Sequence, residues 1–170
     1  MGSVTIRHGA TTGIEKAIAK MKPVSVKIGW FPSARYDDED RTPVASVAAQ
    51  NEYGNPYKRI PARPFIRPAI AQNEKKWADI GKRGLRAVVY NKSTVIQVLQ
   101  DIGSRAVGDI QHSIDQVYSP PLSRRTIEAR LARRTHKGRL NKTQARTITK
   151  PLLDTGKMRA TVAYELSSGS

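Results

Sequence analysis

A short run near the end of the chain places an aspartate in a pattern that is catalytic in other proteins. Residues 152–156 read Leu-Leu-Asp-Thr-Gly, the pattern around the catalytic aspartate of retroviral-type aspartic proteases, in which two aspartates share one proton. Only 16 residues follow Asp154, and the flap and closing half of that fold would have to come after the motif. We therefore expect Asp154 to cap a single helical turn before a last strand, and an aspartic protease remains only a remote alternative.

Other groups that could do chemistry are scattered along the sequence. The histidines His8, His112 and His136 lie far apart, and the chain has no cysteine, which excludes disulfides and thiolate metal sites. The acidic run at residues 37–40 lacks the alternating ligands and the turn glycine of a calcium loop. The sequence contains no phosphate-binding loop and no dinucleotide-binding glycine motif. We therefore expect no catalytic site, no metal and no cofactor, and hence no enzyme.

The charge of the chain is large and unevenly distributed. Thirty Lys and Arg residues oppose 14 Asp and Glu residues, for a net charge of +16 and a pI near 10.5. Such a balance favours polyanionic partners, which can be nucleic acid, an anionic membrane surface or an acidic protein. The run SRRTIEARLARRTHKGR at residues 123–139 could follow phosphates, although no aromatic side chain is interleaved for base stacking. A basic DNA-binding protein is therefore the main alternative function.

Periodicity and capping signals predict the elements that would position these groups. Alternation of apolar residues indicates strands, apolar residues at helical spacing indicate amphipathic helices, and Gly and Pro mark their ends. Thr42 before Pro43 predicts a helix start, and Gly54 predicts its end. The predicted strands are 3–8, 24–31 and 159–166, and the predicted helices are 11–22, 43–54, 67–88, 94–117 and one that follows Ser123.

These elements predict one α+β domain over residues 1–170. A small, mostly antiparallel sheet would form from the N- and C-terminal strands and pack against long central helices, with extended loops. A proline-rich loop would occupy residues 55–68, and a basic mobile segment would occupy residues 133–150. Gly103 and Gly108 lie inside the helix 94–117, where each costs about 1 kcal/mol relative to Ala, so we expect close backbone packing at both.

The proline-rich loop combines stiffness, charge and apolar side chains. Prolines at 61, 64 and 68 fix φ at three places and so lower the entropy lost on ordering. Phe65 and Ile66 could form an apolar plug, and the guanidinium groups of Arg63 and Arg67 could make forked contacts with carboxylates. The sequence leaves two alternatives open, because Phe65 could pin the loop to the chain's own core or the loop could dock on a partner.

Five segments in a fixed order resemble one family. They are VKIGWF, TPVASVAAQNEYG, IPARPFIRPAI, PPLSRRTIEAR and PLLDTGKMRATVAYEL, and together they extend over about residues 27–166. In this order they resemble the tail-completion, or neck, proteins of long-tailed bacteriophages, a broad group that includes the lambda-like minor tail protein Z. The N-terminal strand and helix and the basic stretch 135–150 fall outside the pattern.

The resemblance implies a structural virion protein that is made in the host bacterial cytoplasm. Proteins of this family form homo-oligomeric rings at the head–tail junction, where they complete the tail and join it to the head connector. The implied partners are further copies of the chain, a head connector or stopper protein, and a tail terminator or tail tube protein. The six-fold symmetry of tails makes a hexamer the expected ring. Genomic DNA would pass through the ring without sequence-specific contacts, and no membrane would be involved.

Two sets of charged and apolar residues are candidates for these contacts. The acidic loop would face cations of an adjacent subunit or ring, with Arg63 and Arg67 as the first candidates, and the basic segment would face DNA or a partner. The candidates for contacts between subunits or rings are Asp37, Asp38, Glu39, Asp40, Arg63, Phe65 and Arg67, and those for the DNA channel or a partner are Arg133, Arg134, Lys137, Arg139 and Lys142.

Overall fold

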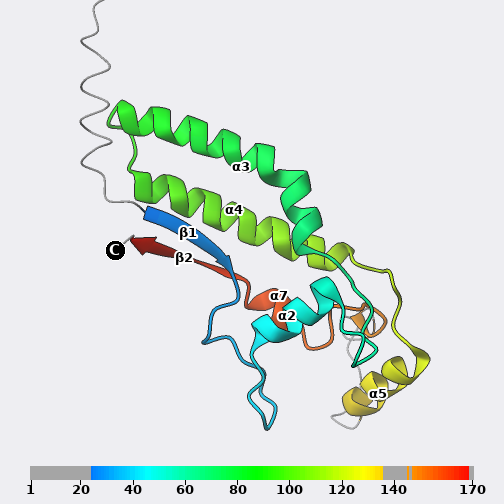
Figure 1. The fold of residues 1–170 in the computed structure, drawn as a ribbon. Coiled ribbons are helices and arrows are strands. Elements are labelled where there is room, and N and C mark those ends of the chain that lie inside the picture. The colour runs from blue at the N-terminus through cyan, green and yellow to red at the C-terminus, as the bar shows by residue number, and fades with distance from the viewer. Residues whose placement is uncertain (1–23, 136–144, 146, 169–170) are drawn as a thin grey trace, which may run out of the picture.

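The fold consists of a two-stranded sheet, a long helical hairpin and a cluster of shorter elements at one end of that hairpin (Figure 1). The structure, a computed structural model, describes residues 24–135, 145 and 147–168. The predicted strand 3–8 and helix 11–22 lie outside the described residues. The elements are β1 (Val24–Gly29), α2 (Val44–Tyr53), α3 (Ile66–Val89), α4 (Val95–Gln116), α5 (Arg124–Thr135), α7 (Lys157–Ala160) and β2 (Ala163–Ser168).

The two ends of the described chain pair in one antiparallel sheet. Val24 lies opposite Ser168 and Gly29 lies opposite Ala163. Within β1 the exposed Ser25 and Lys27 alternate with half-buried apolar residues, as the alternating pattern predicted. Helix α4 runs along this sheet, and α3 packs on α4 (Figure 1). The predicted α+β fold, with a small antiparallel sheet against long central helices, is thus confirmed.

The helical hairpin begins and ends close to the predicted residues. Thr94 caps α4 through a capping box. Its hydroxyl accepts a hydrogen bond from the Gln97 backbone N–H, and the Gln97 side-chain oxygen accepts one from the Thr94 backbone N–H. The sequence predicts α3 from apolar residues at helical spacing, namely Ile70, Trp77, Gly81, Leu85 and Val88. Their predicted burial is partly wrong, because Ile70 and Leu85 are exposed. The buried residues of α3 are Ala69 and Asn73 instead.

Helix α2 starts one residue later than predicted. Pro43 occupies the N-cap position in an extended conformation, and no side chain caps the helix. Thr42 therefore lies outside the helix, and its backbone N–H donates to Asp38 Oδ1 at 2.7 Å. Gly54 ends α2 with a φ of 78°, as predicted, and a Cβ at this position would lie 2.9 Å from the Ala62 nitrogen.

The core lies where α2, the start of α3 and the C-terminal half of α4 meet residues 152–162. The ring of Phe65, with no exposed surface, stacks edge-to-face against Trp30 with ring centroids 5.8 Å apart. The Trp30 indole N–H donates to the Met158 carbonyl at 2.7 Å. The buried cluster consists of Val44, Ala48, Phe65, Ala69, Ile110, Ile114, Leu152, Leu153, Met158 and Val162.

The two helical glycines of α4 give a matched test of close packing. A Cβ at Gly103 would lie 2.6 Å from the ring of Tyr164, whereas a Cβ at Gly108 would meet nothing within 4 Å. The expectation of close packing is therefore right for Gly103 and wrong for Gly108, which faces open space.

We expect Gly103→Ala to destabilise the fold by about 1–3 kcal/mol through overpacking, and Gly108→Ala to stabilise it by roughly 0.5–1 kcal/mol through helix propensity. Chemical denaturation of both variants checks this; equal shifts would contradict the α4–β2 packing.

Candidate interaction site: a cleft along α2

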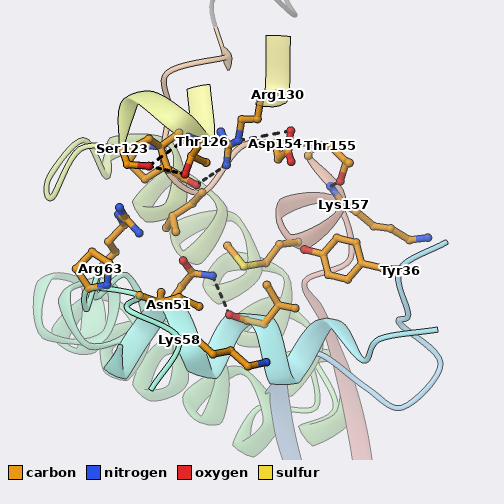
Figure 2. A pocket seen from close by; sticks show the side chains of 18 of the residues that line it. Tyr36, Asn51, Lys58, Arg63, Ser123, Thr126, Arg130, Asp154, Thr155 and Lys157 are labelled. Atoms are coloured by element: carbon orange, nitrogen blue, oxygen red, sulfur yellow. Dashed lines mark hydrogen bonds and ion pairs between the residues drawn. The ribbon is translucent and has the colours of Figure 1, made fainter. Parts of the chain in front are cut away.

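A cleft of about 1100 Å³ runs along α2. Its walls come from the loop before α2, the turn after it, the start of α5 and residues 151–158, and Val47 and Asn51 of α2 line it. Figure 2 shows Arg130 beside Asp154, with Arg63 at one end of the opening and Tyr36 and Lys157 at the other. We call this feature the α2 cleft.

Asp154 gathers three arginines of α5 at the rim of the α2 cleft. The Arg133 guanidinium donates to Asp154 Oδ2 at 2.8 Å. Arg130 and Arg134 lie within 3.6 Å and 3.5 Å of Asp154 Oδ1, and Arg134 also donates to the Asp154 backbone carbonyl. Through these arginines Asp154 ties α5 to the segment before α7. Burial and, to a smaller extent, the negative charge of Asp154 also raise the pKa of the nearby Tyr36 hydroxyl.

Asp154 does not have the capping role that its sequence position predicted. Gly156 occupies the N-cap of α7, with a φ of 77° and no side-chain cap, and the Lys157 backbone N–H instead donates to the Thr155 hydroxyl oxygen at 3.2 Å. The carboxylate pairs instead with three guanidinium groups of α5. The expectation of a cap at Asp154 is therefore corrected to an interhelical ion-pair centre.

Arg130 is buried, yet it retains a full set of partners. Its side chain is only 8% exposed, and it donates to the carbonyls of Lys150 at 2.7 Å and Pro151 at 3.0 Å. Burial lowers the pKa of this guanidinium, but an arginine remains charged at neutral pH. Arg130 thus holds residues 148–151 against α5.

Arg63 plays the same part at the other end of the α2 cleft. Its Nε donates to the Pro120 carbonyl at 2.7 Å and its Nη2 to the Pro121 carbonyl at 3.0 Å. The residue is 6% exposed, and burial lowers the pKa of its guanidinium. The predicted forked contact is therefore made to two backbone carbonyls of the same chain, and Arg63 is withdrawn from the candidates for contacts between subunits.

Glu52 anchors the proline-rich loop from inside the fold. Its carboxylate is 1% exposed and accepts hydrogen bonds from the backbone N–H groups of Phe65 at 2.7 Å, Ile66 at 2.8 Å and Arg67 at 3.2 Å. The Arg67 Nε adds an ion pair at 2.9 Å. Burial by itself raises the pKa of Glu52, but these hydrogen bonds outweigh it and hold the pKa below its usual value. A carboxylate at the first N–H groups of α3 also suits the positive end of that helix.

Phe65 pins the proline-rich loop to the chain's own core, which was one of the two alternatives that the sequence left open. Phe65 has no exposed surface, because it fills the core beneath α2, so it does not form an external plug. Arg67 makes its forked contact within the chain, to the side chain and carbonyl of Glu52, although 59% of its side chain remains exposed.

Two of the four acids predicted to contact another subunit or ring have partners within the chain. Asp37 pairs with Lys157 at 2.6 Å, and the hydrogen bond from Lys157 lowers the pKa of Asp37. Asp38 accepts the Thr42 backbone N–H. Glu39 and Asp40 are exposed, and neither side chain has a hydrogen bond or an ion pair with a described residue.

The first residues of the predicted basic segment are helical. Arg133 and Arg134 belong to α5, which continues to Thr135, because Asp154 compensates their charge. Residues 136–144 and 146, and with them the candidates Lys137, Arg139 and Lys142, lie outside the described residues. Lys150 is placed, since its ammonium donates to the Asp115 carbonyl at 3.1 Å and lies over the Tyr118 ring at 5.0 Å.

Two residues that organise the site were not identified from the sequence. Glu52 follows Val44 and Ala48 at intervals of four. The helical period therefore places this acid on the buried face of α2, and that unusual position was a signal in the sequence. Arg130 lies in an arginine-rich helix, and nothing in its local pattern distinguishes it from its neighbours.

The chemistry of the described site is that of a structural junction. Every buried side-chain nitrogen and oxygen among the described residues has a hydrogen-bond partner, and the buried arginines use their donors on backbone carbonyls. No group of three or more potential metal-ligating side chains occurs among the residues that the structure describes. Within the same residues, no helix combines the length and apolar character needed to cross a membrane.

Comparison with known proteins gives no further guide. No family model, no curated protein and no solved structure matches this chain.

A substitution at Asp154 separates the ion-pair role from a capping role. We expect Asp154→Asn to destabilise the fold by about 2–3 kcal/mol, because it leaves Arg130 and Arg134, both largely buried, without a compensating charge. A cap would tolerate Asn almost without loss. Thermal unfolding of Asp154→Asn checks the difference, with Thr155→Ala as the control for the start of α7. A stability equal to that of the wild type would favour the cap.

Proposed function

We propose that this chain is a structural protein of the neck of a tailed bacteriophage, where a homo-oligomeric ring completes the tail and joins it to the head connector. The proposal starts from the five sequence segments that resemble tail-completion proteins. It assigns no reaction to the chain, and the functional surface of the chain would bind other proteins of the assembling particle.

One observation carries the proposal: long-range hydrogen bonds join all five segments that carry the resemblance into a single unit. Trp30 of the first segment binds Met158 of the last. Glu52 of the second binds the backbone of residues 65–67 in the third. Arg63 of the third binds the prolines that open the fourth, and Arg130 of the fourth binds Pro151 of the last. The resemblance thus rests on residues that build one structural unit around the α2 cleft.

The fold also suits a protein that must keep its shape under mechanical force. The junction is stiffened by charge-assisted hydrogen bonds from buried Arg63, Arg130 and Glu52, which are stronger than neutral ones. The long α3–α4 hairpin projects beyond this junction (Figure 1).

Binding of nucleic acid is the second candidate function, and the outer face of α5 favours it. Arg124 and Arg133 keep 93% and 64% of their side chains exposed, and Arg125 is exposed as well. Such a face can contact DNA phosphates without reading their sequence. In a neck ring this face would line the DNA channel, so the two functions share one surface.

Omission of the chain from phage assembly tests the proposed function. Lysates without it are expected to contain filled heads and separate tails, and addition of the purified protein is expected to restore joined, infectious particles. An unrelated basic protein of similar size serves as the control. Joined particles that form without the chain would contradict the proposal. Salt-dependent binding to short duplex DNA without any joining activity would favour the DNA-binding alternative.

A further inference from the structure

Two oppositely charged loops lie at the two ends of α2. The acidic loop, residues 35–41, precedes the helix, and the basic turn, residues 55–60, follows it (Figure 1). Between them lie the ten residues of α2, which separate the two loops by about 15 Å along the helix axis. The negative and positive charges of this region therefore lie at opposite ends of α2.

The acidic loop is held in one conformation by its own backbone. Tyr36 N–H donates to the Thr42 carbonyl at 2.8 Å, and Val44 N–H donates to the Ala34 carbonyl at 2.9 Å. Arg41 adopts a φ of 51° and closes the turn through its N–H to the Asp38 carbonyl at 3.1 Å. The loop contains four acids and two arginines, so its net charge is negative.

The basic turn is closed in a similar way. Asn55 and Ile60 exchange two backbone hydrogen bonds, at 2.8 and 2.9 Å. The Asn55 side chain accepts the Lys58 N–H at 3.0 Å, and Arg59 takes a φ of 52°. The turn presents Tyr57, which is fully exposed, together with the exposed side chains of Lys58 and Arg59.

Five charged side chains of these loops have no hydrogen bond or ion pair within the described part of the chain. They are Glu39, Asp40 and Arg41 at one end of α2 and Lys58 and Arg59 at the other. The other charged groups of the acidic loop are engaged, since Asp37 pairs with Lys157, Asp38 accepts the Thr42 backbone N–H and Arg35 donates to the Arg41 carbonyl. The acidic loop keeps a net negative charge, and the basic turn carries two uncompensated cations. Because the backbone of each loop is already ordered, binding costs mainly the rotamer freedom of these side chains.

We propose that a second copy of this chain is the partner of both loops, with Glu39 and Asp40 of one copy against Lys58 and Arg59 of the next. The contact is heterologous, because each copy uses the acidic end of α2 towards one neighbour and the basic end towards the other. Repetition of such a contact closes a ring when its rotation permits. Tyr57 lies beside the cations, and an exposed tyrosine supplies a large contact area at low entropic cost. The inference rests on the homo-oligomer of the proposed function and names its contact.

The same arrangement explains how a strongly basic chain can associate with itself. At a net charge of +16, two copies repel one another unless opposite charges meet locally. The acidic loop was expected to face Arg63 and Arg67, but Arg63 is buried and both arginines have partners within the chain. Lys58 and Arg59 take that place. Rim pairs of this kind mainly steer association, so their effect is largest at low salt.

Charge reversal of each loop, alone and together, tests the contact. The first variant is Glu39→Lys with Asp40→Lys, the second is Lys58→Glu with Arg59→Glu, and the third combines all four changes. Sedimentation velocity of the full chain at low and at high salt is the measurement. Two controls change the net charge equally at exposed sites elsewhere: Glu74→Lys with Asp101→Lys, and Lys75→Glu with Arg83→Glu. Thermal unfolding of every variant confirms that each is folded.

The contact predicts a complementation pattern that general charge effects do not produce. The wild type and both controls should form an oligomer at low salt. Each loop variant alone should lose it, an equimolar mixture of the two should regain it, and the four-fold variant should regain it alone. A monomeric wild type, oligomers of either loop variant that match the wild type, or a mixture that stays monomeric would each overturn the proposal.

The outcome for this contact is separate from that for the proposed function. Normal joining of heads and tails by both loop variants, with no loss of their oligomer, would remove the contact and leave the proposed function standing. Charge-dependent self-association of a chain that is absent from particles would leave the contact and remove the proposed function.

Discussion

Replacement of Glu52 by alanine is expected to destabilise the fold by about 3–5 kcal/mol, the largest effect of any single substitution considered for this chain. The Glu52 carboxylate is the acceptor for the backbone N–H groups of Phe65 and Ile66, which have no other acceptor among the described residues. Each buried donor left unsatisfied costs about 1–3 kcal/mol, and the partly exposed Arg67 also loses its ion partner. For a chain of this length each kcal/mol lowers Tm by roughly 2–4 °C, so thermal unfolding should resolve the change clearly.

Two comparisons separate the carboxylate of Glu52 from its ion pair. Arg67→Ala removes the guanidinium, but 59% of that side chain is exposed and the backbone N–H groups keep their acceptor, so a loss of only about 1 kcal/mol is expected. Glu74→Ala changes an exposed acid on α3 and should alter stability by at most about 0.5 kcal/mol. If Glu52→Ala cost no more than Glu74→Ala, the junction between α2 and α3 would be wrong.

The stabilisation from Glu52 should also depend on pH in a defined direction. Its pKa is lower in the folded chain than the value of about 4.3 expected when the chain is unfolded. The stabilisation is therefore fully present above about pH 5, begins to decrease near the unfolded pKa and is lost as pH falls through the folded pKa. In Glu52→Gln this part of the acid sensitivity should be missing. Stability measured between neutral and acidic pH for both proteins checks the sign.

Replacement of Arg130 by methionine is expected to cost about 2–4 kcal/mol and to loosen α5 in particular. Methionine retains much of the apolar stem but leaves the Lys150 and Pro151 carbonyls without a donor, and hydrogen bonds to charged groups contribute about 1.5–3 kcal/mol each. Asp154 also loses one of its three cations. Amide hydrogen exchange should show faster opening of α5 than in the wild type.

The matched control for Arg130 lies on the same helix. Arg125 is exposed, so Arg125→Met should change stability by no more than about 0.5 kcal/mol and should leave exchange in α5 unaltered. Arg130→Lys keeps the charge, but a single ammonium cannot span two carbonyls and a carboxylate, so an intermediate loss is expected. Equal behaviour of Arg125→Met and Arg130→Met would show that α5 is not held by Arg130.

The elements that local signals specify were predicted well. The alternation in β1 and the C-terminal glycine of α2 each depend on residues close in sequence, and each is found where the sequence predicted it. The start of α4 was also predicted to within one residue, and the structure adds the capping box at Thr94. The exposed side chains of Ile70 and Leu85 were assigned to the interior because periodicity identifies an apolar stripe but not how wide a face the neighbouring helix covers.

The residues that organise the candidate site could not be predicted from local pattern. Arg63 binds carbonyls 57 and 58 residues away, and Arg130 binds carbonyls 20 and 21 residues away. A charged residue is placed inside a fold only when such partners compensate the loss of water, and the sequence does not show which segments will meet. Asp154 was assigned to a cap for the same reason, since its arginine partners lie about 20 residues earlier in the chain.

The position of this chain in an intact particle is the most direct test of the proposed neck function. Cryo-electron microscopy of tailed-phage particles assembled in the presence of this chain, with symmetry imposed only after the junction has been located, would reveal where its fold lies. The account predicts a ring of identical copies between head connector and tail, recognisable by the α3–α4 hairpin packed against the two-stranded sheet. A junction fully accounted for by other proteins, with no density for this fold, would contradict it.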